Sequence, residues 1–177
     1  MLDVVLGDSI DDAGGYIAEV IYGANDGIVT TFAVVAGVAG ANLDPGIVLI
    51  LGIANLLADG FSMGMSNFLS QRSARDYREA QGTGPGEATK PPGYTALATF
   101  LAFVVAGWTP LLPYALALDP TFPLSVGVTT AAFFVVGASR SLVTDRPWYT
   151  AGGEMFAVGM VAAGVAFGTG TALRGIA

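Results

Sequence analysis

Residues 16–41 read YIAEVIYGANDGIVTTFAVVAGVAGA, an almost unbroken apolar run with Glu19 near its start and Asp26 near its middle. A helix needs roughly 20 apolar residues to cross the hydrocarbon core of a bilayer, and this run is longer than that. On insertion-based scales an acidic side chain at the centre of such a helix costs roughly 2.5–3.5 kcal/mol. An aspartate there indicates a cavity that handles an ion, a proton or a polar substrate, and so favours transport.

The composition is that of an integral membrane protein. The chain has 177 residues, of which 53% are hydrophobic and only 12% are charged, whereas soluble domains contain about 25% charged residues. The net charge of −7 argues against nucleic acid as a partner. The lack of a basic amphipathic segment argues against recruitment to anionic lipid. Cysteine and histidine are absent from the sequence, which excludes disulfides, thiolate metal sites and Ser-His or Cys-His catalytic pairs.

Four further apolar runs of spanning length follow the first one, at residues 46–70, 94–118, 121–143 and 149–173. Pro110 and Pro113 fall near the end of the third run and predict a kinked or unwound segment there. We therefore expect an all-α, polytopic membrane domain of five transmembrane helices over residues 16–177. An acidic cytosolic tail at 1–15 precedes it, and a flexible cytosolic loop at 71–93 joins the second and third helices.

The basic residues predict the orientation. Only Arg174 of the seven falls elsewhere, and the other six lie around the second and fourth connections: Arg72, Arg75, Arg78, Lys90, Arg140 and Arg146. The positive-inside rule then places the N-terminus in the cytosol and the C-terminus outside. The acidic start is a poor signal peptide, so we expect a plasma membrane location, or a vacuolar-type membrane if the chain is eukaryotic.

Polar side chains form a stripe on each of the first two helices. The first stripe consists of Glu19, Tyr22, Asp26 and Thr30, and the second of Asn55, Asp59, Ser62, Met63 and Ser66. Asp26 and Asp59 each lie roughly 15 Å from the inner end of their helices, which predicts two carboxylates at one level. Met63 lies about one turn nearer the cytosol. Glu19, close to the interface, is expected to be a solvated boundary residue.

Carboxylates and thioethers at similar depth favour a divalent cation of intermediate softness, such as Fe²⁺ or Mn²⁺, over Ca²⁺ or Mg²⁺. Glu154 and Met155 begin the fifth span at a depth comparable to Met63 and join this candidate set. The carboxylates can take up protons once the metal leaves, which is a basis for metal/proton exchange. Simpler interpretations stay open, since Met63 could fill the core and Glu154 could interact with a helix dipole.

Small residues at four-residue spacing predict close helix packing. They are Gly23 and Gly27 on the first helix and Gly60 and Gly64 on the second. The contact could lie within one subunit or between two subunits of a dimer.

Two motifs resemble the vacuolar iron transporter family. They are Tyr22-Gly-Ala-Asn-Asp-Gly-Ile-Val-Thr-Thr-Phe and Ala54-Asn-Leu-Leu-Ala-Asp-Gly-Phe-Ser-Met-Gly-Met-Ser-Asn-Phe-Leu-Ser, followed by Arg72-Ser-Ala-Arg-Asp-Tyr. The resemblance implies a dimeric five-helix protein that exports Fe²⁺, and often Mn²⁺, by proton antiport along a path at the subunit interface. It also implies that Asp26 is the translocation carboxylate and Met63 the pathway methionine.

The chain departs from the family's pattern at two places. Residues 71–93 are short and contain no methionine, whereas members with a cytosolic metal-collecting domain insert a Glu- and Met-rich segment there. Asn55 occupies the position of a glutamate in some members, and Asp59 supplies an acid one turn further on.

The leading hypothesis is therefore a secondary transporter that exports Fe²⁺ or Mn²⁺ from the cytosol in exchange for H⁺. It is expected to act as a homodimer in the lipid bilayer and to need no permanently bound cofactor. Two alternatives remain, a non-transporting membrane scaffold or regulatory subunit, and an intramembrane aspartyl hydrolase that uses Asp26 and Asp59 as its acid/base pair.

Overall fold

The computed structural model describes residues 2–82, 91–142 and 144–175, with side chains from residue 16 onward. In these ranges the chain forms helices and no β-strand. The elements in order are α1 (Leu2–Ala41), α2 (Pro45–Ala80), α3 (Pro92–Gly107), the 3₁₀ turn η1 (Thr109–Leu111), α4 (Leu112–Ala115), α5 (Thr121–Ser139), the 3₁₀ turn η2 (Arg140–Leu142) and α6 (Trp148–Leu173).

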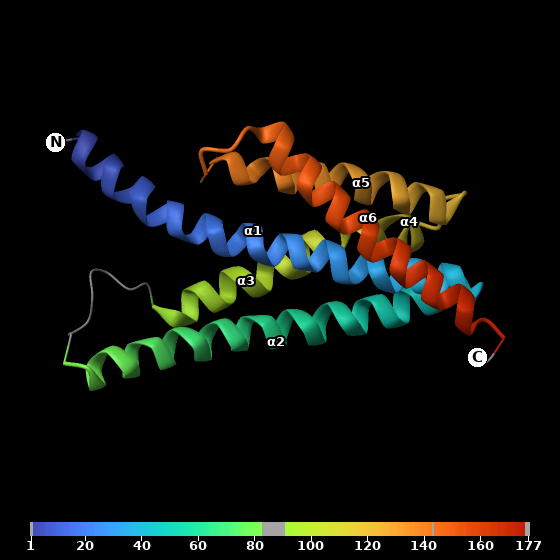
Figure 1. Ribbon diagram of the computed structural model, residues 1–177, viewed down its shortest axis with the longest axis horizontal. Helices are drawn as coiled ribbons and strands as arrows, with labels where there is room; N and C mark the ends of the chain where they lie inside the picture. Colours follow the sequence, from blue (N-terminus) through green and yellow to red (C-terminus); the bar gives the residue numbers. More distant parts are fainter. Residues whose placement is uncertain (1, 83–90, 143, 176–177) are drawn as a thin grey trace.

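Within the described residues, five segments are long and apolar enough to cross a membrane. They are Tyr16–Ala41, Pro45–Ala80, Pro92–Ala115, Thr121–Leu142 and Trp148–Leu173. The predicted all-α architecture with five spans is thus confirmed, and the protein is a multi-pass membrane protein. In Figure 1 the N-terminus, the end of α2, the start of α3 and the connection before α6 lie at one end of the bundle. These segments carry the predicted cytosolic arginines, so we call this the arginine end. Its cytosolic placement stays a prediction.

Two predicted boundaries differ from the structure. Helix α1 begins at Leu2, so the residues expected to form a separate tail continue the first helix, and α2 continues to Ala80 rather than ending near Ser70. Residues 71–80, QRSARDYREA, are polar but contain neither glycine nor proline and include several good helix formers. Hydropathy marks where the apolar span ends and not where the helix ends, which explains the error. The middle of the predicted loop, 83–90, lies outside the described residues.

The third span is interrupted where its prolines predict an interruption. Helix α3 ends at Gly107, and the turn η1 and the short α4 follow, with Pro110 and Pro113 inside them. Proline has no amide hydrogen and clashes with the preceding turn, so a regular helix cannot continue through both positions.

The α1–α2 connection is built from two capping residues. Asn42 ends α1 in the left-handed region with a φ of 57°, a conformation that asparagine tolerates better than most residues. The Asp44 carboxylate accepts a hydrogen bond of 2.7 Å from the Gly46 amide, and Pro45 occupies the first turn of α2. These caps allow the tight reversal that makes α1 and α2 antiparallel.

Helix α1 runs through the centre of the bundle, with α3 on one side and α6 on the other (Figure 1). Its fully buried side chains include Ile28, Phe32 and Val35. Phe32 packs edge-to-face against Phe133 of α5 with ring centroids 6.1 Å apart. The core therefore forms around α1, and the other helices are positioned by their contacts with it.

The predicted glycines pack on α3 within the same chain. A Cβ atom at Gly23 would stand 2.5 Å from the Thr99 carbonyl oxygen, and one at Gly27 would meet the carbonyl oxygen of Phe103. On α2, a Cβ at Gly60 would stand 3.1 Å from the ring of Phe103, and one at Gly64 3.0 Å from a carbonyl oxygen of α3. Both glycine pairs thus make the intrasubunit contact, one of the two alternatives left open by the sequence.

We expect Gly27→Ala to destabilise the folded protein by about 1–3 kcal/mol, because the added methyl group meets a backbone carbonyl that cannot move aside. Thermal unfolding in detergent measures the effect. Gly164→Ala is the matched control, since Gly164 is a helical glycine of α6 and an added methyl group there would have no neighbour within 4 Å. Equal unfolding temperatures for the two variants would contradict the tight α1–α3 contact.

Candidate functional site

The two predicted aspartates lie on neighbouring helices of the bundle. Asp26 of α1 and Asp59 of α2 are both half-buried, and their charges interact. Thr30 donates a hydrogen bond of 2.8 Å to the backbone carbonyl of Asp26, one turn earlier in α1. In the described part of the chain no lysine or arginine forms an ion pair with either aspartate. The structure therefore brings together two carboxylates that lack a compensating positive side chain.

A cavity of about 370 Å³ opens between α1 and α2 beside Met63, on the side of the aspartates that faces the arginine end. We call it the α1–α2 cavity, and it is lined by Glu19, Tyr22, Met63, Ser66, Asn67, Ser70 and Gln71. A carboxylate, a thioether, amides and hydroxyls thus share one hollow. Each of these groups is an acceptable ligand for a first-row divalent cation.

Glu19 lines this cavity and is hydrogen-bonded there, in contrast to its predicted place at the solvated boundary. It is half-buried, and its Oε2 atom accepts a hydrogen bond from Asn67 Nδ2 at 2.6 Å. Thr99 Oγ1 lies 3.3 Å from the same oxygen and shares its one hydrogen with the Thr95 carbonyl, which is 2.9 Å away. The prediction of a solvated boundary residue is therefore wrong. Proximity to the interface suggested solvation, but α2 and α3 both pass beside this position and supply donors.

The donors to Glu19 were not among the predicted site residues. Asn67 lies four residues after Met63 and eight after Asp59, so it continues the polar stripe of α2 by one further turn. That spacing was a usable signal. Thr99 lies in an apolar stretch of α3, where the sequence carries no sign of its partner.

A hydrogen-bonded network extends from Glu19 into α3. Gln71 donates through Nε2 to Asn67 Oδ1 at 2.8 Å and to Thr95 Oγ1 at 2.7 Å. Thr95 in turn donates to the Pro92 carbonyl at 3.0 Å. Three helices are joined by polar groups that satisfy one another, which fixes the position of the Glu19 carboxylate.

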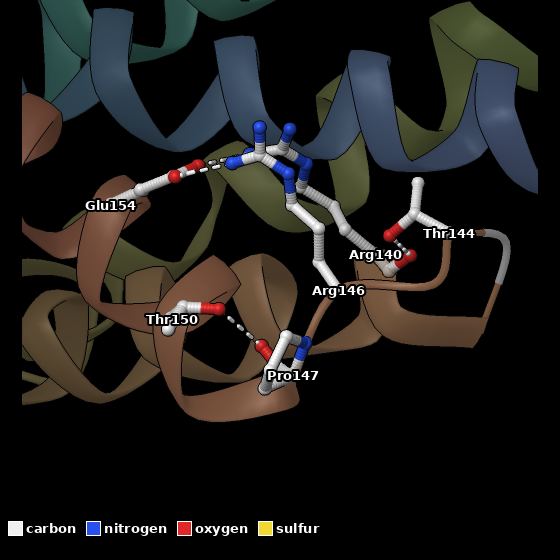
Figure 2. A network of polar contacts seen from close by, with 6 residues as sticks. All are labelled: Arg140, Thr144, Arg146, Pro147, Thr150 and Glu154. Carbon is white, nitrogen blue, oxygen red and sulfur yellow. Dashed lines mark hydrogen bonds and ion pairs between the residues drawn. The ribbon is translucent and has the colours of Figure 1, made fainter.

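Glu154 lies apart from the aspartates, in a different environment from the predicted one. Its carboxylate forms ion pairs with two arginines, as Figure 2 shows. Arg146 Nη1 lies 2.6 Å from Oε1, and Arg140 Nη1 lies 3.5 Å from Oε2. Neighbouring Met155 is 4% exposed and belongs to the core. The sequence could not show that the two arginines before α6 fold back onto this residue.

The α1–α6 cavity, of about 760 Å³, lies beside Glu154 on the other side of α1. It is lined by Ala18, Ile21, Tyr22, Asn25, Arg140, Thr144, Glu154, Met155, Ala157 and Val158. Tyr22 lines this cavity and the α1–α2 cavity as well, and its side chain is 61% exposed. The predicted pathway tyrosine therefore stands between two cavities.

The remaining predicted site residues lie along α2. Asn55 is half-buried, whereas Ser62 and Ser66 are exposed on the surface of the single chain. Among the described residues no group of three or more Asp, Glu, His or Cys side chains gathers in one place. Asp26, Asp59 and Glu19 therefore do not form a metal site of three carboxylates within the described residues of one chain.

The fold and this site define the class of the protein: a five-span helical membrane protein with paired acids between its first two helices. The chain matches the VIT family over residues 17–85 and 78–171. It belongs to that family. The two matched ranges overlap at residues 78–85, where α2 ends at Ala80.

Curated relatives agree with this assignment. The chain is 28% identical to vacuolar iron transporter 2 of Oryza sativa subsp. japonica, in an alignment that covers 93% of this chain and 90% of that protein. It is 33% identical to vacuolar iron transporter homolog 5 of the same organism, over 75% of this chain and 71% of the relative. A vacuolar iron transporter of Toxoplasma gondii is 47% identical over 66 residues, which are 37% of this chain but only 22% of that protein.

We expect the Glu19–Asn67 hydrogen bond to contribute a coupling energy of about 1 kcal/mol or more, because a partly buried carboxylate loses its shortest donor when Asn67 is removed. A double-mutant cycle with Glu19→Ala and Asn67→Ala, read by thermal unfolding in detergent, measures it. Ser66→Ala in the same cycle is the control, since Ser66 lines the cavity. A coupling for Asn67 no larger than for Ser66 would show that the bond does not hold Glu19.

Proposed function

We propose that this protein is a secondary transporter that exports Fe²⁺ or Mn²⁺ from the cytosol in exchange for protons. The observation that carries the proposal is the Asp26–Asp59 pair, which lies in the first two spans without a lysine or arginine partner in the described residues. The names of the curated relatives support iron as a substrate.

The electrostatics of the aspartate pair support exchange. Two carboxylates in a low-dielectric environment repel each other strongly. Either a divalent cation between them or a proton on one of them relieves this repulsion. Metal and protons therefore compete for one site, which is the requirement for coupling their movements in opposite directions.

The α1–α2 cavity supplies the approach to that pair. A cation in it meets the Glu19 carboxylate, the Met63 thioether and the Asn67 amide before it reaches Asp26 and Asp59. Asn55, one turn beyond Asp59, provides an amide oxygen further along the same stripe. The thioether favours Fe²⁺ and Mn²⁺ over Ca²⁺ and Mg²⁺. We leave Glu154 out of this path because two arginines already neutralise it.

We also propose that two copies of the chain share the path. Ser62 and Ser66 are exposed on α2, within a span that is largely unburied by its own chain. Hydroxyls that face acyl chains can bond only the backbone of their own helix, whereas a second copy placed against α2 would cover them and complete the ligand set.

Asp26→Asn is expected to lower the initial rate of metal flux at least about tenfold, equivalent to about 1.4 kcal/mol, because the neutral amide neither attracts the cation nor releases a proton. Proteoliposomes with an imposed pH gradient and a pH-sensitive dye inside measure Fe²⁺ and Mn²⁺ flux together with proton movement.

Asp119→Asn, an exposed aspartate in the α4–α5 connection, is the control and is expected to retain full flux. Wild-type rates in the Asp26 variant would remove the site assignment. A wild-type protein that moves metal without moving protons would refute the antiport mechanism, and one that moves no metal would favour a scaffold role.

Met63→Leu is expected to reduce Fe²⁺ flux by roughly threefold or more while the fold is kept, because leucine conserves the volume and removes the sulfur ligand. Met65→Leu is a close control, since Met65 lies two residues away, is 40% exposed and does not line the cavity. Equal fluxes in the two variants would mean that the thioether of Met63 fills space only.

A further inference from the structure

The α1–α6 cavity combines a charged mouth with apolar walls. Arg140 and Thr144 line it near the connection before α6, whereas Ala18, Ile21 and Val158 line it further along the two helices. Its volume of about 760 Å³ lies within the range of about 300–1,000 Å³ that ligand pockets have. Such a groove suits a ligand that is charged at one end and apolar along its length.

The mouth of this cavity is positively charged. Arg140 and Arg146 both direct their guanidinium groups toward Glu154, as Figure 2 shows, so two positive charges face one negative charge. The arginine side chains are 41% and 61% exposed. A guanidinium group has five N–H donors, and one carboxylate cannot use those of two arginines. Donors therefore remain for a second anion, while a metal cation is repelled.

The depth of the mouth matches that of lipid headgroups. Helix α6 begins at Trp148, and the side chains of Trp148 and Tyr149 are 57% and 58% exposed. Exposed tryptophan and tyrosine at the end of a span mark the membrane–water interface. The arginines lie in the segment just before these rings, whereas Val158 lies roughly 15 Å further along the helix than Trp148. The apolar part of the groove therefore extends into the hydrocarbon layer.

We propose that the α1–α6 cavity binds one anionic phospholipid, with its headgroup phosphate at Arg140 and Arg146 and an acyl chain along the groove. A soluble anion would use the arginines but not the apolar walls. The sequence contains no continuous basic segment, which argued against anionic lipid. The fold nevertheless assembles a basic site from two arginines six positions apart in the chain. The site does not rest on the proposed function, although Tyr22 lines both this cavity and the α1–α2 cavity.

Native mass spectrometry of the detergent-purified full chain, with added phosphatidylglycerol or phosphatidylcholine, tests the proposal. We expect the wild-type protein to retain phosphatidylglycerol in preference to phosphatidylcholine. Arg140→Gln combined with Arg146→Gln is expected to lower that preference by about fivefold for each arginine removed. Arg72→Gln, an exposed arginine of α2 at the same end of the bundle, is the control and is expected to leave it unchanged.

A second pair of variants tests the groove and keeps both arginines. Val158→Trp is expected to reduce retention of phosphatidylglycerol several-fold, because the ring occupies the groove. Val161→Trp is the control, since Val161 lies on α6 with an exposure similar to that of Val158 but does not line the cavity. The proposal is overturned by an equal effect of both tryptophans, by an equal effect of Arg72→Gln, or by a wild-type protein without headgroup preference. Glycerophosphoglycerol that displaces the lipid at equal concentration would overturn the acyl-chain contact.

Discussion

The close approach of α1 and α3 determines the orientation of α1. Gly23 and Gly27 lie directly against the backbone of α3. Gly107 of α3 lies against α1 in turn, since a Cβ atom added there would stand 2.8 Å from the Gly27 carbonyl oxygen. Lipid tails are as apolar as leucine, so association of helices in a membrane depends on such close packing and on polar contacts. With its glycine face against α3, α1 has only one orientation about its own axis. In that orientation the stripe with Asp26 faces α2.

The same contact also positions Glu19. Thr99 presents its backbone to Gly23, and its hydroxyl lies 3.3 Å from the Glu19 carboxylate, so one residue of α3 both packs against α1 and contacts its acid. Helix α2 reaches α3 through Gly60 and Gly64 and brings Asn67 to the other side of Glu19. Packing and the polar network are therefore not separate features. A shift of α1 along α3 would break the hydrogen bonds of Glu19 and separate Asp26 from Asp59.

Much of this arrangement follows from the sequence. Apolar runs of spanning length indicated the five helices, and the two prolines predicted the break after Gly107. Depth counted along two antiparallel helices predicted Asp26 and Asp59 at one level, and the two charges interact. Each of these inferences rests on local geometry. The environments of Glu19 and Glu154 could not be obtained this way, because their partners, Thr99 and Arg146, are brought to them by the tertiary fold. The length of α2 was underestimated for another reason, since polar residues can continue a helix after its apolar span has ended.

The two acidic side chains near the arginine end have opposite electrostatic surroundings, and this difference directs cations. Glu19 holds its charge among neutral donors, so the α1–α2 cavity stays negative, whereas Glu154 faces two arginines, so the mouth of the α1–α6 cavity is positive. Both cavities border Tyr22, so this residue of α1 separates the two charged environments. On the proposed path, a divalent cation is therefore attracted to the Glu19 side of α1, whereas the side with the two arginines suits the anionic headgroup.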